Sequence, residues 1–147
     1  MPSEQLHELV SMRLRQAGQR YTDKRRSLVD ILAECERPVT IHQIIEREPS
    51  IPQSSAYRNI SVLEDARAVT RIVTSGDYAR FELAQELTEH HHHLICTICG
   101  EVSDFTLTSA FEDDLDKRLE KASREQGFAA RDHRLDVLGT CARCDSA

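Results

Sequence analysis

Apolar residues recur at helical spacing near the start of the chain. Leu6, Val10 and Leu14 fall on one helical face and Gly18 follows as a stop, which predicts a first helix. Thr22 can cap a second helix, because its side-chain oxygen can accept a backbone N–H bond from the first turn. The apolar face of this second helix would carry Leu28, Ile31, Leu32 and Cys35.

Two further helices are predicted in the first half. Thr40 and Gln43 form a capping-box pattern that opens a short third helix. Pro52 favours the first turn of a fourth helix, which we expect to run to about Arg67. One face of this fourth helix is apolar, with Ala56, Ile60 and Leu63. Its other face carries Ser54, Tyr57, Arg58, Ser61 and Asp65.

Two β-rich runs, residues 69–73 and 78–83, flank a turn at residues 75–77. Helices followed by such a hairpin are typical of a winged helix-turn-helix domain. In that arrangement the fourth helix would enter the major groove of DNA, with small polar residues near its N-terminus reaching base edges. A plain helical bundle with a hairpin is the alternative interpretation.

The second half predicts a different, small α+β unit. Residues 90–97 and 101–107 read as a hairpin around Cys99 and Gly100. Residues 115–126 read as a helix with Leu115, Leu119 and Ala122 facing inward, and residues 134–138 as a strand. Residues 84–89 are the expected linker. We therefore expect an α+β protein with two domains, residues 1–85 and 86–147.

Composition narrows the protein class. The 147 residues contain no apolar run near the ~20 residues of a membrane span, and we expect no signal peptide at the start. A cytoplasmic globular protein is the expectation. Residues 1–85 are balanced in charge, so the net charge of −6 resides in residues 86–147. A basic cluster in the first half is a candidate partner-binding surface: Arg13, Arg15, Arg20, Lys24, Arg25 and Arg26.

Four of the five cysteines form two C-x-x-C pairs, Cys96 with Cys99 and Cys141 with Cys144. Each pair can present two thiolates from one tight turn, and two pairs complete a tetrahedral zinc site. Such a site would tie the end of the chain to the hairpin and contribute folding energy. A redox motif and an iron–sulfur cluster are the rival interpretations. Cys35 is best explained as a buried small apolar residue.

Four consecutive histidines, residues 90–93, precede the first cysteine pair. On a strand, alternate side chains point to opposite faces, so His90 and His92 would face one way and His91 and His93 the other. One strand could thus supply two separate metal sites, since imidazole is the commonest metal ligand. Further ligands must come from elsewhere, and spacing alone does not select among the candidates Glu82, Asp104, Asp116 and His133.

Several motifs together resemble the ferric uptake regulator family. The resemblance runs from about Leu14 to Cys144, and the histidine run leading into C-x-x-C-G is its most specific part. The other segments that carry it are Arg20-Tyr21-Thr22 with Arg25, Tyr57-Arg58-Asn59-Ile60 with Leu63, Phe81-Glu82-Leu83, Asp104-Phe105, His133-Arg134-Leu135 and Gly139-Thr140-Cys141.

The resemblance implies a homodimeric, metal-sensing transcriptional repressor with an N-terminal winged helix and a C-terminal dimerisation domain. Residue by residue, it implies three metal sites. The structural zinc site would be Cys96, Cys99, Cys141 and Cys144. The regulatory site would be Glu82, His91, His93 and Asp104. The additional site would be His90, His92, Asp116 and His133, with Glu112 competing with Asp116 for the last position.

Two departures from the family pattern leave the regulatory metal open. Pro38 stands where iron and peroxide sensors usually supply a histidine, and His42 lies one turn later. Ala84 stands near the place where some zinc sensors have a cysteine, so Glu86 or Glu89 could enter the site. Histidine and carboxylate donors suit Zn²⁺, Fe²⁺ or Mn²⁺, and we favour zinc or iron.

The interpretation adopted from the sequence is a metal-dependent repressor that controls iron or zinc uptake genes. It would bind a palindromic operator in double-stranded DNA as a homodimer, with no membrane and no small-molecule substrate as partner. Arg20, Ser54, Ser55, Tyr57 and Arg58 are the expected DNA contacts. A peroxide-sensing regulator of the same family is one alternative. A zinc hydrolase is the other, although the sequence has no H-E-x-x-H motif and we expect no enzyme.

Overall fold

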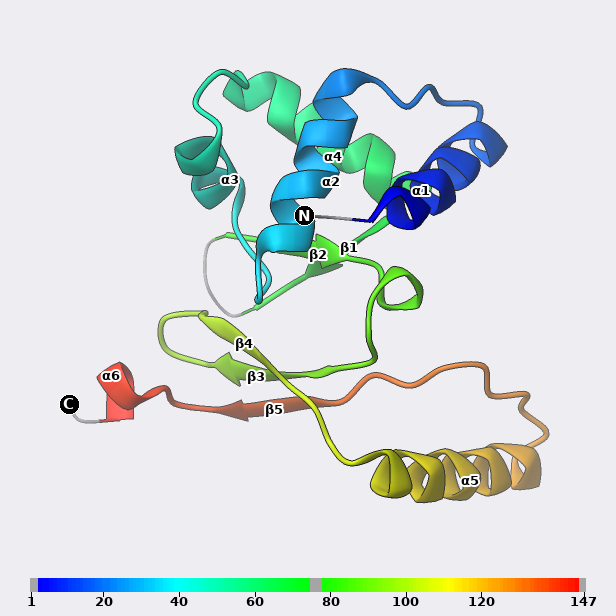
Figure 1. Cartoon of the computed structure of the whole chain (residues 1–147). Coiled ribbons are helices and arrows are strands. Elements are labelled where there is room, and N and C mark those ends of the chain that lie inside the picture. Colours follow the sequence, from blue (N-terminus) through cyan, green and yellow to red (C-terminus); the bar gives the residue numbers. More distant parts are fainter. Residues whose placement is uncertain (1–2, 75–77, 146–147) are drawn as a thin grey trace.

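The computed structural model describes residues 3–74 and 78–145, so the predicted turn at residues 75–77 lies outside the described residues. Four helices come first, followed by a hairpin, a second sheet and a long helix (Figure 1). The described elements are α1 (Glu4–Gln16), α2 (Asp23–Glu34), α3 (Ile41–Arg47), α4 (Gln53–Asp65), β1 (Val69–Ile72), β2 (Arg80–Leu83), the 3-10 turn η1 (Gln85–Leu87), β3 (His92–Cys96), β4 (Val102–Phe105), α5 (Ser109–Glu125), β5 (Asp136–Gly139) and α6 (Ala142–Asp145). No helix among the described residues is long and apolar enough to cross a membrane.

The helices of the first half begin where the sequence predicts. The Thr22 hydroxyl accepts from the Arg25 backbone N–H at the start of α2. At α3 the Thr40 side chain accepts from the Gln43 N–H at 3.2 Å, and the Gln43 side chain accepts from the Thr40 N–H at 2.9 Å. Pro52 precedes α4 as its N-cap residue rather than lying within its first turn. These caps satisfy N–H groups that have no partner inside the helix.

One hydrophobic core fills the first half. It gathers apolar side chains from α1 to α4 with those of the β1–β2 hairpin, including Leu28, Ile44, Ile60, Leu63 and Phe81. The hairpin is antiparallel, with Val69 opposite Leu83 and Ile72 opposite Arg80. An isolated bridge between Val39 and Phe81 joins the segment before α3 to β2. This is the predicted winged helix-turn-helix arrangement.

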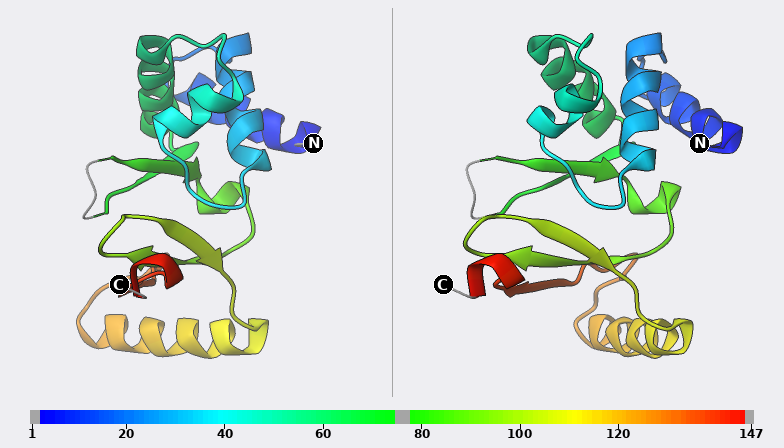
Figure 2. Two further views of the ribbon diagram at one scale, coloured as in Figure 1. Left: turned by 90° about the vertical axis from the view of Figure 1, so that its left-hand side faces the viewer. Right: turned by 60° about the vertical axis from the view of Figure 1, so that its left-hand side comes forward.

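The second sheet has the strand order β4-β3-β5. Strand β3 pairs antiparallel with β4 and parallel with β5, so it lies at the centre of the sheet. Two views show the β1–β2 hairpin on one side of this sheet and α5 on the other (Figures 1 and 2). The predicted β-β-α-β order is confirmed, and the α+β class with it.

Helix α5 corrects two predictions. The predicted helix began at Leu115, but α5 begins at Ser109, because the Thr108 side chain accepts from the Phe111 N–H and caps it. The predicted apolar face of Leu115, Leu119 and Ala122 is not buried in a single chain: Leu115 is half-buried and the other two are exposed. Among the described residues of the second half, the buried apolar side chains are Ile95, Cys96 and Val102. Ile95 and Val102 pack on Ile72 of the hairpin rather than on α5.

The connection between the halves is short and structured. The predicted linker, residues 84–89, contains the 3-10 turn η1, and Leu87 packs against the core of the first half. The Gln85 amide donates to the His91 carbonyl at 2.9 Å. Farther away, Arg37 and Glu101 form an ion pair at 2.8 Å across the halves.

Leu28→Ala should lower the free energy of unfolding by about 2–5 kcal/mol, because Leu28 is fully buried and its truncation leaves a cavity. Met12→Ala is the control, since Met12 is 48% exposed, and its cost should stay near 0.5 kcal/mol or below. Urea unfolding followed by circular dichroism measures both. An equal loss of unfolding free energy in the two variants would contradict this assignment of the core.

Candidate metal centres

Three groups of side chains among the described residues could each hold a metal ion. Within each group, one donor atom per residue lies within 4.8 Å of all the others. The hinge group is Glu82, His91, His93 and Asp104. The outer group is His90, His92, Glu112 and His133. The cysteine group is Cys96, Cys99, Cys141 and Cys144.

The hinge group joins the two halves of the chain. Glu82 lies on β2 of the hairpin and is buried, while His93 and Asp104 are opposite each other on β3 and β4. The Glu82 carboxylate contacts both imidazoles, His91 Nε2 at 3.0 Å and His93 Nε2 at 2.8 Å. Asp104 lies 3.7 Å from both of these nitrogens. Four donors from the two halves therefore converge on one small volume.

Charge in the hinge group is concentrated and poorly hydrated. Burial lowers the pKa of His91, but its bonds to the Glu89 carbonyl and to Glu82 outweigh burial and raise it overall. The pKa of His93 is raised in the same way, by Glu82 and Asp136 against burial. Burial and the charge of Glu82 also raise the pKa of the Asp104 carboxyl. Without a metal, the two rings therefore attract protons to balance the carboxylates.

Unpartnered buried atoms show that a cation fits both histidine groups. In the hinge group, Asp104 Oδ1 is buried without a hydrogen-bond partner. In the outer group, Glu112 Oε2 and His133 Nε2 are also buried without a hydrogen-bond partner. Buried polar atoms in folded proteins are normally paired, and these three belong to donor types that bind divalent metals.

In the outer group, the structure brings Glu112 rather than Asp116 together with the three histidines. Glu112 contacts His92 Nε2 at 2.5 Å and lies 3.4 Å from His90 Nε2. The earlier start of α5 places Glu112 in its first turn, beside β3. Asp116 follows one turn later and contacts the other nitrogen of His133, Nδ1, at 3.1 Å. The hydrogen bond to His92 holds the pKa of Glu112 below its ordinary value against the effect of burial.

The cysteine group brings the end of the chain back to the β3–β4 turn. Cys99 Sγ lies 3.8 Å from Cys141 Sγ, and the Cys141 N–H donates to Cys96 Sγ at 3.4 Å. Backbone N–H groups of Cys141 and Cys99 hold the pKa of Cys96 below its ordinary value, which favours the thiolate. Cys35 lies elsewhere, half-buried against the first core.

Three other candidate ligands stay outside the hinge group. The His42 ring is exposed and contacts Tyr78 edge to face, with 6.4 Å between the ring centroids. The side chains of Glu86 and Glu89 are exposed, and Glu89 takes part only through its carbonyl, which accepts from His91 Nδ1 at 2.9 Å. Sequence reasoning missed Asp136, which contacts His93 Nδ1 at 3.2 Å from β5. Only the parallel pairing of β3 and β5 reveals that contact.

The predicted DNA contacts divide into exposed and structural residues. Arg20, Ser54, Tyr57 and Arg58 are exposed. Ser55 is half-buried, and its hydroxyl accepts from the Asn59 amide at 3.2 Å. Asn59 in turn accepts from Arg25 Nε at 3.0 Å, which fastens α4 to α2. Helix α4 is thereby held with its polar face outward.

Fold and site define a helix-turn-helix protein with three candidate metal-binding groups, one of them between its two halves, and comparison with known proteins agrees. The Ferric uptake regulator family profile matches residues 16–138. The ferric uptake regulation protein of Brucella suis is 35% identical over 128 residues, covering 84% of this chain and 86% of that protein. The ferric uptake regulator of Pseudomonas aeruginosa, solved with manganese, is 27% identical with a TM-score of 0.69, covering 88% and 95% of the two chains. The Helicobacter pylori ferric uptake regulator has the same fold, with a TM-score of 0.71 at 22% identity over 98% and 94% of the chains.

The chain therefore belongs to the ferric uptake regulator family, whose members are metal-dependent regulators of transcription. Since family members are regulators rather than enzymes, the zinc-hydrolase interpretation is abandoned.

Glu82→Gln should lower the pKa of His91 and His93 in the metal-free protein, because it removes the carboxylate that both Nε2 atoms contact. Both values are raised in the folded chain, so the protonated rings stabilise it fully below about pH 6.5. That stabilisation is lost as the pH rises through the raised values, and the variant should show a weaker loss. Histidine NMR titration and melting temperatures across this range measure both effects.

Glu86→Gln is the matched control, since Glu86 is exposed in the same connection. Unchanged pKa values for His91 and His93 in the Glu82 variant would refute the geometry of the hinge group.

Proposed function

We propose that this protein is a metal-dependent repressor of iron or zinc uptake genes, acting in the cytoplasm as a homodimer on a palindromic operator. Residues 1–85 would form the DNA-binding domain and residues 86–147 the metal-binding dimerisation domain. The residues of the three groups would act as metal ligands, with Glu112 in place of Asp116 in the outer group.

The hinge group is the observation that carries this proposal. Glu82 belongs to the wing, and His93 and Asp104 belong to the second sheet, so one ion would bind ligands from both domains. Binding energy that requires both domains in one relative orientation favours that orientation over all others. In a dimer, this fixes the spacing of the two α4 helices, which must match successive major grooves. Metal would thereby control affinity for DNA.

The donor atoms suit different metals in different groups. Four thiolates form a closed set typical of structural zinc. The hinge group offers two imidazoles and two carboxylates, which suit Zn²⁺, Fe²⁺ or Mn²⁺. The Pseudomonas aeruginosa relative was solved with manganese, which supports a labile divalent ion in this family.

Uncovered apolar side chains support the homodimer. Leu94 and Val137 are neighbours on β3 and β5, and both are exposed on the side of the sheet away from the hairpin. Helix α5 and the segment after it add exposed Phe111, Leu119 and Phe128. Large apolar side chains in such number mark an interaction surface, and a second copy of the chain would cover it.

Replacing both His91 and His93 with Ala should abolish metal-induced DNA binding while leaving a folded dimer. The substitutions remove two of the four hinge donors and leave the outer group intact. Replacing both His90 and His92 with Ala should reduce affinity more gradually. Fluorescence anisotropy measures DNA affinity as divalent metal is added at a fixed salt concentration. The DNA is a palindromic duplex selected beforehand from a random library in the presence of metal. Indistinguishable curves for the two double variants would disprove the two-face arrangement.

Arg58→Ala is the control for the DNA side of this experiment. It should weaken binding at every metal concentration and leave the metal content unchanged, because Arg58 is exposed on α4 and lies outside all three groups. Equal affinity for random and selected duplexes, whatever the metal, would contradict a repressor.

Cys96→Ser should abolish zinc retention and lower the melting temperature, because it breaks the closed four-thiolate set. Cys35→Ser is the matched control, since Cys35 lies apart from this group and should leave the zinc content at the wild-type level. Elemental analysis and thermal melting measure both. A Cys96 variant with full zinc and normal melting would refute the structural role.

A further inference from the structure

Each histidine group has a carboxylate behind one of its rings, on the side away from the converging donors. In the hinge group, Asp136 contacts His93 Nδ1 at 3.2 Å, while His93 Nε2 contacts Glu82. His93 and Asp136 are paired residues of the parallel strands β3 and β5, so their side chains lie next to each other on one face. Arg134 Nε lies 3.0 Å from Asp136 Oδ2 and 3.2 Å from Oδ1, so it holds this carboxylate in place.

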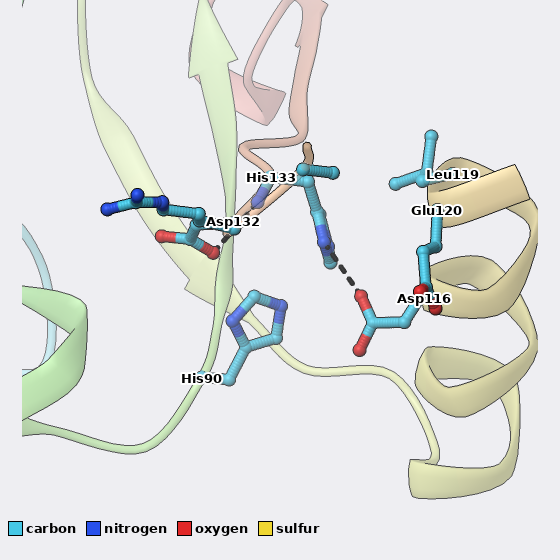
Figure 3. A pocket seen from close by; sticks show the side chains of 8 residues that line it. His90, Asp116, Leu119, Glu120, Asp132 and His133 are labelled. Atoms are coloured by element: carbon cyan, nitrogen blue, oxygen red, sulfur yellow. Dashed lines mark hydrogen bonds and ion pairs between the residues drawn. The ribbon is translucent and has the colours of Figure 1, made fainter. Parts of the chain in front are cut away.

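The outer group repeats the arrangement with different elements. His133 Nδ1 contacts Asp116 Oδ1 at 3.1 Å across the gap between the chain before β5 and helix α5 (Figure 3). His133 Nε2 is buried without a hydrogen-bond partner and lies 3.7 Å from Glu112 Oε2. The ring of His90 lies next to that of His133, with 4.9 Å between the ring centroids (Figure 3).

The contacts of these imidazole rings decide which ring nitrogen carries the proton and which can bind a metal. A neutral ring carries one proton, and only the nitrogen without it can bind a metal. An ionised carboxylate accepts hydrogen bonds but does not donate them. Asp116 therefore keeps the proton of His133 on Nδ1, and Asp136 would do the same for His93 when a metal ion at Nε2 replaces the hydrogen bond to Glu82. The lone pair is then left on Nε2, the atom that faces the other donors in each group. His91 achieves the same result with the Glu89 carbonyl.

We propose that Asp136 and Asp116 are positioning residues, each fixing the tautomer and orientation of one metal-binding histidine without binding the metal itself. This inference rests on the proposed metal sites. Asp136 is engaged on both oxygens, by His93 and by Arg134. Asp116 is 64% exposed in its side chain and contacts the nitrogen of His133 that points away from Glu112. Asp116, which the sequence suggested as a metal ligand, would thus hold the ligand His133 in place instead.

Asp136→Leu and Asp116→Leu should each weaken a different site. Outer carboxylates of this kind are worth about 10- to 100-fold in metal affinity. Competition of Co²⁺ and Zn²⁺ against a chromophoric chelator should show this loss at the hinge site for Asp136→Leu and at the outer site for Asp116→Leu. The double variants His91→Ala with His93→Ala and His90→Ala with His92→Ala identify which site is which.

Two further variants separate positioning from packing. Asp136→Asn keeps an oxygen that can accept from His93 Nδ1, so it should retain more affinity than Asp136→Leu. Asp113→Leu is the control for Asp116→Leu, since Asp113 is exposed on α5 and belongs to none of the three groups, and it should change neither site. The number of Co²⁺ ions bound at saturation and their visible spectra should match the wild type in every aspartate variant. Loss of one ion, or a changed Co²⁺ spectrum, would make the aspartate a ligand and overturn the proposal.

NMR of the metal-free protein tests the tautomer directly and needs no DNA. His133 is the ring to follow, because Asp116 contacts its Nδ1 while its Nε2 has no hydrogen-bond partner. At alkaline pH, where imidazoles are neutral, long-range ¹H–¹⁵N spectra should show His133 protonated on Nδ1. In Asp116→Leu this proton should move to Nε2, and in Asp136→Leu it should stay on Nδ1. An unchanged His133 tautomer in Asp116→Leu, or unchanged metal affinities, would refute positioning even if metal-dependent DNA binding holds. If DNA binding proved independent of metal while the tautomer shift and both affinity losses occurred, only the proposed function would fail.

Discussion

The second half of this chain, as a single copy, buries too few apolar side chains to hold itself together. Its described residues bury only Ile95, Cys96 and Val102 among apolar side chains, and two of these pack on Ile72 of the wing. A small unit without a sufficient core usually depends on metal, disulfides or a partner chain. The cysteine and histidine groups lie where such a core is missing, at the turn beyond β3, at the hinge and beneath α5. Metal bound at these groups would therefore contribute directly to the cohesion of this half.

Strand β3 supplies histidines to candidate metal groups on both sides of the second sheet. His93 and Ile95 face the wing, where Glu82 and Ile72 meet them, while His92 faces α5 and contacts Glu112. An ion on the wing side would act on the angle between the halves. An ion on the other side would fasten α5, which buries no residue of its own. Because the alternation of a strand is fixed, the two ions would have different mechanical effects although their ligands are neighbours in sequence.

The sequence predicted the parts governed by local rules. Caps at Thr22 and Thr40 and the alternation of residues 90–93 all follow from contacts within a few residues. The start of α5 was missed because Thr108 was overlooked as a cap. The sequence pattern therefore favoured Asp116 over Glu112 for the outer group, whereas the structure groups Glu112 with the three histidines. The expected burial of the apolar face of α5 is not found in a single chain, because helical periodicity indicates an apolar face but not what covers it. Asp136 could not be found, since its position beside His93 depends on the parallel pairing of strands 43 residues apart.

Hydrogen exchange with and without bound metal tests the central claim most directly, that metal holds the second half together. After metal removal, backbone amides of β3, β4 and β5 should lose most of their protection, while those of α2 and α4 keep theirs, because the first half has its own core. Restoring zinc should restore protection first around the cysteine group. Equal protection of the second sheet in both states would contradict the account, since its stability would then come from packing that does not depend on metal.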